Sequence, residues 1–141
     1  MHVQQMIGAH PGAAAGVQGR ASEALARCIE AAFDCAQACT ACADACLAEP
    51  RVSELTQCIR FDLDCADVCV ATGTVASRRT GSDAPVVRAL LQACEEACRL
   101  CAQECGRHAH DMAHCRLCAE ACAMCARACA EALADLGGRT H

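Results

Sequence analysis

The chain has 141 residues and a formal net charge of −5, which suits one acidic domain with a buried core. This balance, without any run of lysine or arginine, argues against nucleic acid or a membrane surface as a partner, and no apolar run approaches the roughly 20 residues of a membrane span. The chain contains no tryptophan or tyrosine and only two phenylalanines, which excludes a conventional aromatic core.

The first half of the sequence predicts two long helices after a short N-terminal segment. Residues 1–19 form this segment, and a short helix is expected near residues 3–7. The first long helix is expected to begin with Ser22 as its N-cap and to end near residue 48, before Glu49-Pro50. The second is expected over about residues 52–76.

Two further helices are predicted in the second half. Asp83 is the expected N-cap of the third, Pro85 lies in its first turn, and the helix ends near Arg107. Asp111 is expected to cap the fourth helix, and Gly137-Gly138 to end it. Because the connections are short, residues 20–141 are predicted to form an all-α, antiparallel, up-down-up-down four-helix bundle.

Seventeen cysteines recur mostly three, four or seven residues apart, at the positions that a helical bundle normally fills with leucine and isoleucine. They are Cys28, Cys35, Cys39, Cys42, Cys46, Cys58, Cys65, Cys69, Cys94, Cys98, Cys101, Cys105, Cys115, Cys118, Cys122, Cys125 and Cys129. A single buried cysteine is often only a small apolar residue, but so many in register predict thiol chemistry inside the bundle.

Reduced thiols are a better interpretation than disulfides. The first 16 residues lack the basic and continuous apolar regions of a signal peptide, so a cytoplasmic location is expected. The number of cysteines is odd. Facing helices also pack with axes about 8–10 Å apart, whereas a disulfide needs Cα atoms within about 7 Å. The cysteines are therefore expected to bind metal or to act in redox chemistry.

Copper(I) is the metal that the pattern favours. Thiols three or four residues apart on a helix can hold one ion between them, and Cu(I) is a soft ion that selects thiolate. One monovalent ion per thiolate neutralises the core, whereas each tetrahedral Zn(Cys)4 site keeps two negative charges. We therefore expect many Cu(I) ions, about one per thiol, in a storage protein that is not an enzyme.

Other functions fit less well. Sequestration of zinc or cadmium is the closest alternative, because it uses the same thiol core. An iron–sulfur electron carrier is less expected, because the ferredoxin spacing of cysteines is absent. A thiol oxidoreductase is disfavoured, because no CxxC motif opens a helix in a βαβ context.

The helix order predicts two different bundle ends. Cys46, Cys58, Cys105 and Cys115 should share one end, and apolar residues should close the other. These apolar residues are Leu25, Ile29, Val75, Val87, Leu90, Leu91, Leu133 and Leu136. Metal is therefore expected to enter at the thiol-rich end.

Histidine and methionine are candidate ligands at that end. His108 and Met112 continue the cysteine heptads, and His114 adjoins Cys115. Met112 could instead be a core residue, and the histidines could be solvated. His110 is the weakest of these candidates.

Two further sets of residues leave alternatives open. Asp62 lies at a core position between cysteines, where it could bind metal or form an ion pair with Arg60 or Arg107. Met1, His2, Met6 and His10 could capture copper, although packing across the bundle or disorder is the favoured interpretation of this segment.

With these cysteines in place, the chain resembles the cytosolic bacterial copper storage proteins. The segments that carry the resemblance are FDCAQACTACADACL, LDCADVCVATG, CEEACRLCAQECGRH and HCRLCAEAC. The resemblance implies a homotetramer of bundles filled with Cu(I), with His108 and His114 as ligands at the bundle mouth. Met112 stands where some members carry a further mouth histidine, and Asp62 where a relative has an amide.

Overall fold

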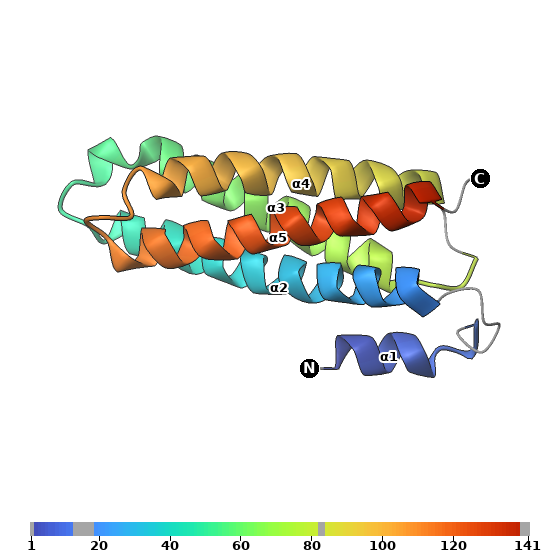
Figure 1. The fold of residues 1–141 in the computed structure, drawn as a ribbon. Helices are drawn as coiled ribbons and strands as arrows, with labels where there is room; N and C mark the ends of the chain where they lie inside the picture. Colours follow the sequence, from blue (N-terminus) through green and yellow to red (C-terminus); the bar gives the residue numbers. More distant parts are fainter. Residues whose placement is uncertain (1, 13–18, 82–83, 139–141) are drawn as a thin grey trace.

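The computed structural model describes residues 2–12, 19–81 and 84–138. Four long helices form the body of the protein: α2 (Gly19–Leu47), α3 (Thr56–Ser77), α4 (Ala84–Gly106) and α5 (Ala113–Gly138). A short helix, α1 (Val3–Ala9), precedes them. Figure 1 shows the four long helices running alternately up and down, as predicted.

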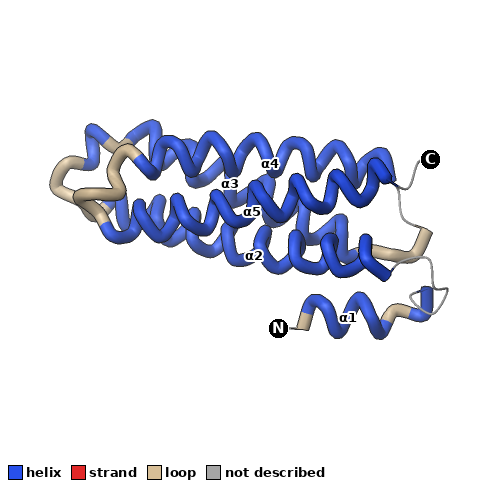
Figure 2. The backbone as a smooth tube through the Cα atoms, in the orientation of Figure 1, coloured by secondary structure: helices blue, strands red, loops and turns tan. Residues whose placement is uncertain are grey.

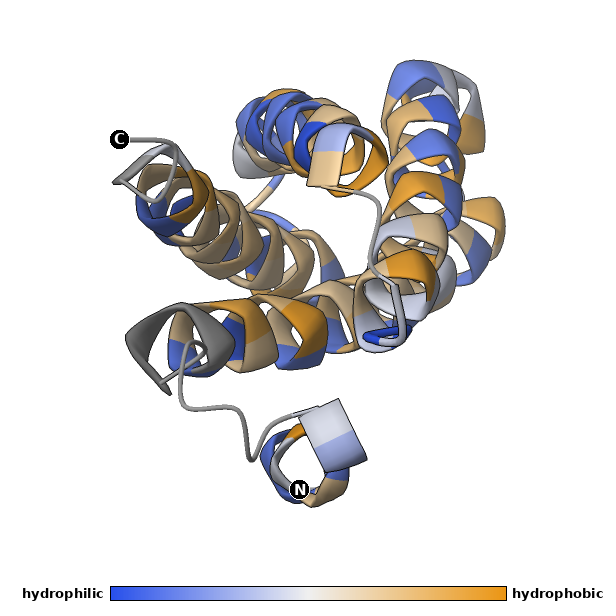
Figure 3. Ribbon diagram, turned by 90° about the vertical axis from the view of Figure 1, so that its right-hand side faces the viewer, coloured by the Kyte–Doolittle hydropathy of each residue, from blue (hydrophilic) through white to orange (hydrophobic). Residues whose placement is uncertain are grey.

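Each long helix packs against two neighbours: α2 contacts α3 and α5, and α4 contacts the same two helices. Figure 3 looks along the bundle and shows the four helices around a common interior, with α1 outside them and beside α2. The side chain of Ile7 is buried where α1 meets the bundle. None of the described helices combines the length with the apolar run that crossing a membrane requires.

Figure 2 shows the helices and the loops that join them. The helix boundaries differ from the predictions in small ways. The first long helix starts at Gly19, three residues before the expected cap Ser22. The fourth starts at Ala113, with Met112 rather than Asp111 at the N-cap, because the Met112 carbonyl accepts the Arg116 N–H at 3.2 Å. The expected cap Asp83 lies outside the described residues.

The second long helix begins at Thr56 rather than near residue 52. A 3-10 turn, Val52–Glu54, comes first, and the backbone N–H of Leu55 donates to the Val52 carbonyl at 2.9 Å. Leu55 is fully buried. The turn therefore brings an apolar side chain into the end of the bundle before the helix starts.

A close contact joins α2 to the last turns of α3. A Cβ atom added at Gly73 would lie 2.8 Å from the ring of Phe33. Glycine thus lets the ring of α2 lie directly against the backbone of α3.

The apolar end is built largely as predicted, although Leu90 is only half-buried and lies outside the core cluster. Leu25, Ile29, Val87 and Leu91 are buried there, and Val75, Leu133 and Leu136 are partly buried against them. The buried hydroxyl of Thr72 donates to the Val68 carbonyl at 2.8 Å, which satisfies its hydrogen bonding inside this end.

Candidate metal centre

All seventeen cysteines point into the bundle as free, buried thiols. The α-helical repeat places them on the inward face of each long helix, as their spacing predicts. Five come from α2, three from α3, four from α4 and five from α5. The interior that would hold leucine in an ordinary bundle is therefore lined with sulfur.

Sulfur atoms from different helices gather in groups of four that share members. Within each group, all four Sγ atoms lie within 4.8 Å of one another. From the apolar end toward the other, these groups are Cys69/Cys94/Cys98/Cys125, Cys35/Cys65/Cys69/Cys98, Cys35/Cys39/Cys65/Cys122 and Cys39/Cys101/Cys118/Cys122. Each group shares two sulfurs with the next. We call these ten cysteines the thiol array.

The shared pairs are close enough to bridge neighbouring ions. The Sγ atoms of Cys39 and Cys122 are 3.5 Å apart, and those of Cys69 and Cys98 are 3.6 Å apart. Because each shared sulfur can bind two ions, the array suits a continuous metal–thiolate cluster better than isolated four-sulfur sites. Beyond the array, Cys28 and Cys129 form a last pair at 3.6 Å, next to the apolar end.

Asp62 lies among thiols near the other end of the array. Its Oδ1 atom is 3.2 Å from Sγ of Cys101, 3.3 Å from Sγ of Cys105 and 3.2 Å from Sγ of Cys118. The side chain is fully buried. Burial, together with the negative charge of a nearby Cys118 thiolate, raises the pKa of Asp62 to about 8.

The predicted ion pair of Asp62 with Arg60 or Arg107 is not formed. Arg60 instead lies 3.7 Å from Asp64, and Arg107 lies 3.5 Å from Glu104. The carboxylate therefore faces the thiols, where it can donate an oxygen ligand or accept S–H hydrogen bonds.

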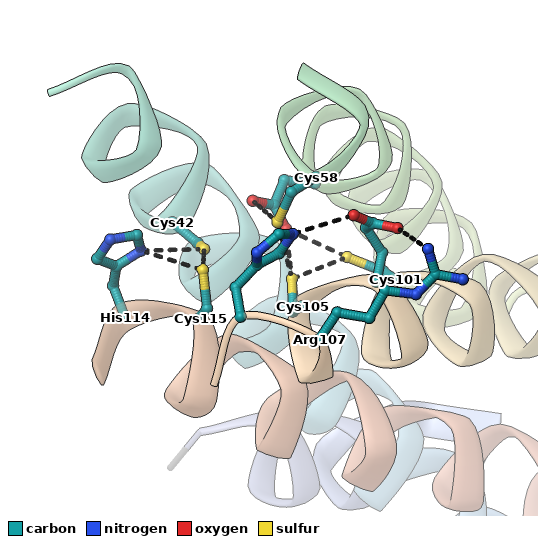
Figure 4. A network of polar contacts seen from close by, with 10 residues as sticks. Cys42, Cys58, Cys101, Cys105, Arg107, His114 and Cys115 are labelled. Carbon is teal, nitrogen blue, oxygen red and sulfur yellow. Dashed lines mark hydrogen bonds and ion pairs between the residues drawn. The ribbon is translucent and has the colours of Figure 1, made fainter. Parts of the chain in front are cut away.

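A mixed group of three thiols and one imidazole lies at the end of the bundle. Cys42, Cys46, His114 and Cys115 have ligand atoms within 4.8 Å of one another. His114 Nδ1 is 3.4 Å from Sγ of Cys42 and 3.6 Å from Sγ of Cys115 (Figure 4). Burial raises the pKa of the Cys115 thiol to about 11. We call these four residues, with His108, the mouth.

A second histidine of the mouth is held by a carboxylate. His108 Nε2 lies 3.2 Å from Oε2 of Glu104, whose side chain is buried although it carries a carboxylate. Nη1 of the exposed Arg107 side chain lies 3.5 Å from the other carboxylate oxygen of Glu104. Nearby, Cys58 and Cys105 have sulfurs 3.5 Å apart.

The other candidate ligands at this end are less well placed. Met112 is buried and belongs to the core cluster, which matches the alternative that it packs in the core. His110 is 75% exposed and lies 3.3 Å from Asp111.

The N-terminal residues lie far from the mouth, beside the turn between α3 and α4 (Figure 1). His10 Nε2 is 2.9 Å from Oγ1 of Thr80, and its Nδ1 accepts the N–H of Gly12 at 2.9 Å. Both ring nitrogens of His10 are thus in use. Met6 is exposed, and Met1 lies outside the described residues. These hydrogen bonds hold His10 against the bundle, and copper capture by His2 and Met6 stays a prediction.

Two carboxylates near the mouth were missed by the sequence reasoning. Glu104 lies four residues before His108, a helical spacing that could have revealed the pair. Glu49 lies 3.6 Å from Nε2 of His114, but Glu49 follows α2 and His114 lies in the first turn of α5, so the pair has no sequence signal.

The fold and the site define an α-helical protein whose core is lined with thiols in groups that could hold metal ions. Residues 21–134 match the family model described as copper storage protein, so the chain belongs to the copper storage protein family. No curated protein matches it.

Solved structures of a Streptomyces lividans protein are similar to the chain. The copper storage protein Ccsp loaded with 10 copper equivalents is 57% identical, with a TM-score of 0.87, and the match covers 94% of this chain and 98% of that one. A structure of the cytosolic copper storage protein with five coppers is 64% identical, with a TM-score of 0.78, covering 79% and 93%. A histidine-to-alanine variant of Ccsp is 64% identical, with a TM-score of 0.80, covering 82% and 96%.

Proposed function

We propose that this chain is a cytosolic, high-capacity store for Cu(I) that holds its ions in the thiol core and catalyses no reaction. The observation that carries the proposal is the thiol array, in which neighbouring four-sulfur groups share two sulfurs each. Membership of the copper storage protein family agrees with this, as does the copper content of the Streptomyces lividans structures.

The single charge of the ion and the sharing of sulfurs between groups both favour Cu(I) over zinc or cadmium. Isolated divalent sites need four thiolates each, and here Cys35, Cys39 and Cys69 each belong to two groups. A low-dielectric core also disfavours uncompensated thiolates, and one monovalent ion per thiolate removes that cost. About one Cu(I) per cysteine is therefore the expected content.

We propose the mouth as the place where copper enters. His114 presents Nδ1 to Cys42 and Cys115, so a first ion can bind one nitrogen and two or three sulfurs. Asp62, beside Cys101 and Cys118, would then be an oxygen ligand on the way to the array. Met112, which is buried in the core cluster, would contribute a thioether.

The resemblance to the cytosolic family also supports a homotetramer. Leucine and methionine side chains on the outer faces agree with such contacts, since Leu63, Leu117 and Met124 are at least half exposed. Light scattering of the purified protein would test this, and a monomer at micromolar concentration would contradict it.

The rate of Cu(I) uptake tests whether copper enters through the mouth. Replacing His108, Met112 and His114 together by alanine should slow uptake of Cu(I) from a chelating donor but leave the capacity nearly unchanged. Uptake at the wild-type rate would refute the role of these residues.

A parallel titration with Zn(II) should reach far fewer ions than Cu(I), and an equal number would favour the zinc alternative.

A further inference from the structure

The two ring nitrogens of His114 face different surroundings. Nδ1 lies beside the sulfurs of Cys42 and Cys115 (Figure 4). Nε2, on the opposite side of the ring, is buried and has no hydrogen-bond partner. A buried ring nitrogen normally has a hydrogen-bond partner, so the group nearest to Nε2 is a candidate for that partner.

The carboxylate of Glu49 lies in front of this nitrogen. Its Oε1 atom is 3.6 Å from Nε2 of His114, just beyond hydrogen-bond distance. The Glu49 backbone is fixed on both sides, because its N–H donates to the Cys46 carbonyl and its own carbonyl accepts the Val52 N–H, both at 3.2 Å. A small movement of either side chain would complete the hydrogen bond.

The chemistry of histidine as a metal ligand indicates a role for the contact between Glu49 and His114. A neutral imidazole has one N–H and one lone pair, and the hydrogen bond made by one nitrogen decides which nitrogen binds metal. Ligating histidines usually donate their second N–H to a carboxylate, which orients the ring and makes the ligand more basic. Glu49 and His114 have this arrangement, with thiols on the metal-binding side.

We propose that Glu49 is a positioning residue for copper capture, which accepts the Nε2–H of His114 and so keeps the Nδ1 lone pair directed at Cys42 and Cys115. The proposal rests on the proposed function, since it assigns a role within the mouth. Without Glu49, the proton can move to Nδ1, where a sulfur can accept it, and the first copper ion then meets an N–H instead of a lone pair.

The ion pairs of the neighbouring arginine are made with other carboxylates than Glu49. Arg51 lies nearby in sequence but pairs with Glu54 and with Asp111. Glu54 is therefore a suitable control, because it is a glutamate of the same loop whose carboxylate faces an arginine rather than the mouth.

The test uses Glu49→Ala, Glu49→Gln and the control Glu54→Ala in the reduced full-length protein. Nitrogen-15 NMR of the apo proteins identifies which nitrogen of His114 carries the proton. Stopped-flow mixing with a chelated Cu(I) donor measures the uptake of the first ions, and a titration measures the total. Circular dichroism confirms that each variant is folded.

We expect Nε2–H in the wild type and a shift toward Nδ1–H in Glu49→Ala, with first-ion uptake slowed about tenfold or more. Glu49→Gln should fall between the two, because its amide oxygen can still accept the N–H but carries no charge. Glu54→Ala should match the wild type, and all four proteins should reach the same capacity.

An unchanged tautomer in Glu49→Ala, or an unchanged rate, would overturn the role of Glu49 while leaving storage intact. A wild-type capacity of four ions or fewer would instead overturn the proposed function. In that case the tautomer of the apo protein would still decide whether Glu49 orients His114.

Discussion

Removing one shared pair of sulfurs should divide the thiol array into two parts. Cys39 of α2 and Cys122 of α5 belong to two neighbouring groups, and their sulfurs are 3.5 Å apart. Cys28 and Cys129 come from the same two helices, with sulfurs 3.6 Å apart, but lie at the end of the core. The double variants Cys39→Ala/Cys122→Ala and Cys28→Ala/Cys129→Ala therefore remove equal numbers of buried thiols and differ in position.

The number of cysteines on each side of the removed pair sets the expected number of Cu(I) ions in each loading phase. Seven cysteines lie on the mouth side of the Cys39/Cys122 pair and eight lie beyond it. With about one ion per thiol, the divided protein should take up about seven Cu(I) ions quickly and about eight slowly. We expect the second phase to be at least about tenfold slower, equivalent to about 1.4 kcal/mol of added barrier.

Anaerobic stopped-flow loading at increasing ratios of copper to protein measures both phases. The Cys28→Ala/Cys129→Ala control should reach about 15 ions with wild-type kinetics, because its two missing thiols lie at the end of the path. If the two double variants load identically, ions do not pass from group to group through shared sulfurs. Urea unfolding of both apo proteins checks that the cavities cost similar stability, about 1 kcal/mol per site.

Three further predictions concern the apo protein. The raised pKa of Asp62, about 8, means that the folded state keeps a proton that the unfolded chain releases near pH 4, so stability falls as the pH rises between these values. Asp62→Asn should therefore stabilise the protein at pH 8 by up to about 5 kcal/mol, with little change at pH 4, and an equal effect at both pH values in urea unfolding would contradict this. Gly73→Ala should cost about 1–3 kcal/mol, because its Cβ would meet the ring of Phe33, and an unchanged melting temperature would refute the contact. Leu91→Ala should lower the apo stability by about 2–4 kcal/mol and leave the Cu(I) capacity unchanged, whereas a lost capacity would show that the apolar end takes part in binding.

The sequence predicts the inward face of every long helix, because the spacing of residues such as Cys94, Cys98 and Cys101 is a local property of the α-helix. It also predicts which end of the bundle is apolar, since short connections fix the alternation of helix direction. The helix starts are less predictable. Leu55 is buried through a 3-10 turn, and this depends on the space left at the end of the packed bundle.

Contacts between helices could not be predicted from spacing alone. Asp62 meets Cys101 of α4 and Cys118 of α5 only because of how the helices are rotated and shifted along one another. Glu49 and His114 likewise come together only because the loop after α2 and the start of α5 meet at the same end of the bundle. Sequence reasoning therefore predicts the ligand types and the end at which metal is expected to enter, whereas the shared sulfur groups and the carboxylate behind His114 require the structure.

The number of Cu(I) ions bound at saturation tests the central claim most directly. Reduced protein is titrated anaerobically with Cu(I) in the presence of a chromophoric competitor, and bound metal is confirmed by elemental analysis after gel filtration. A thiol core with shared sulfurs predicts well above ten ions per chain, near the count of seventeen cysteines. Saturation at four ions or fewer would show that the array does not act as a metal store.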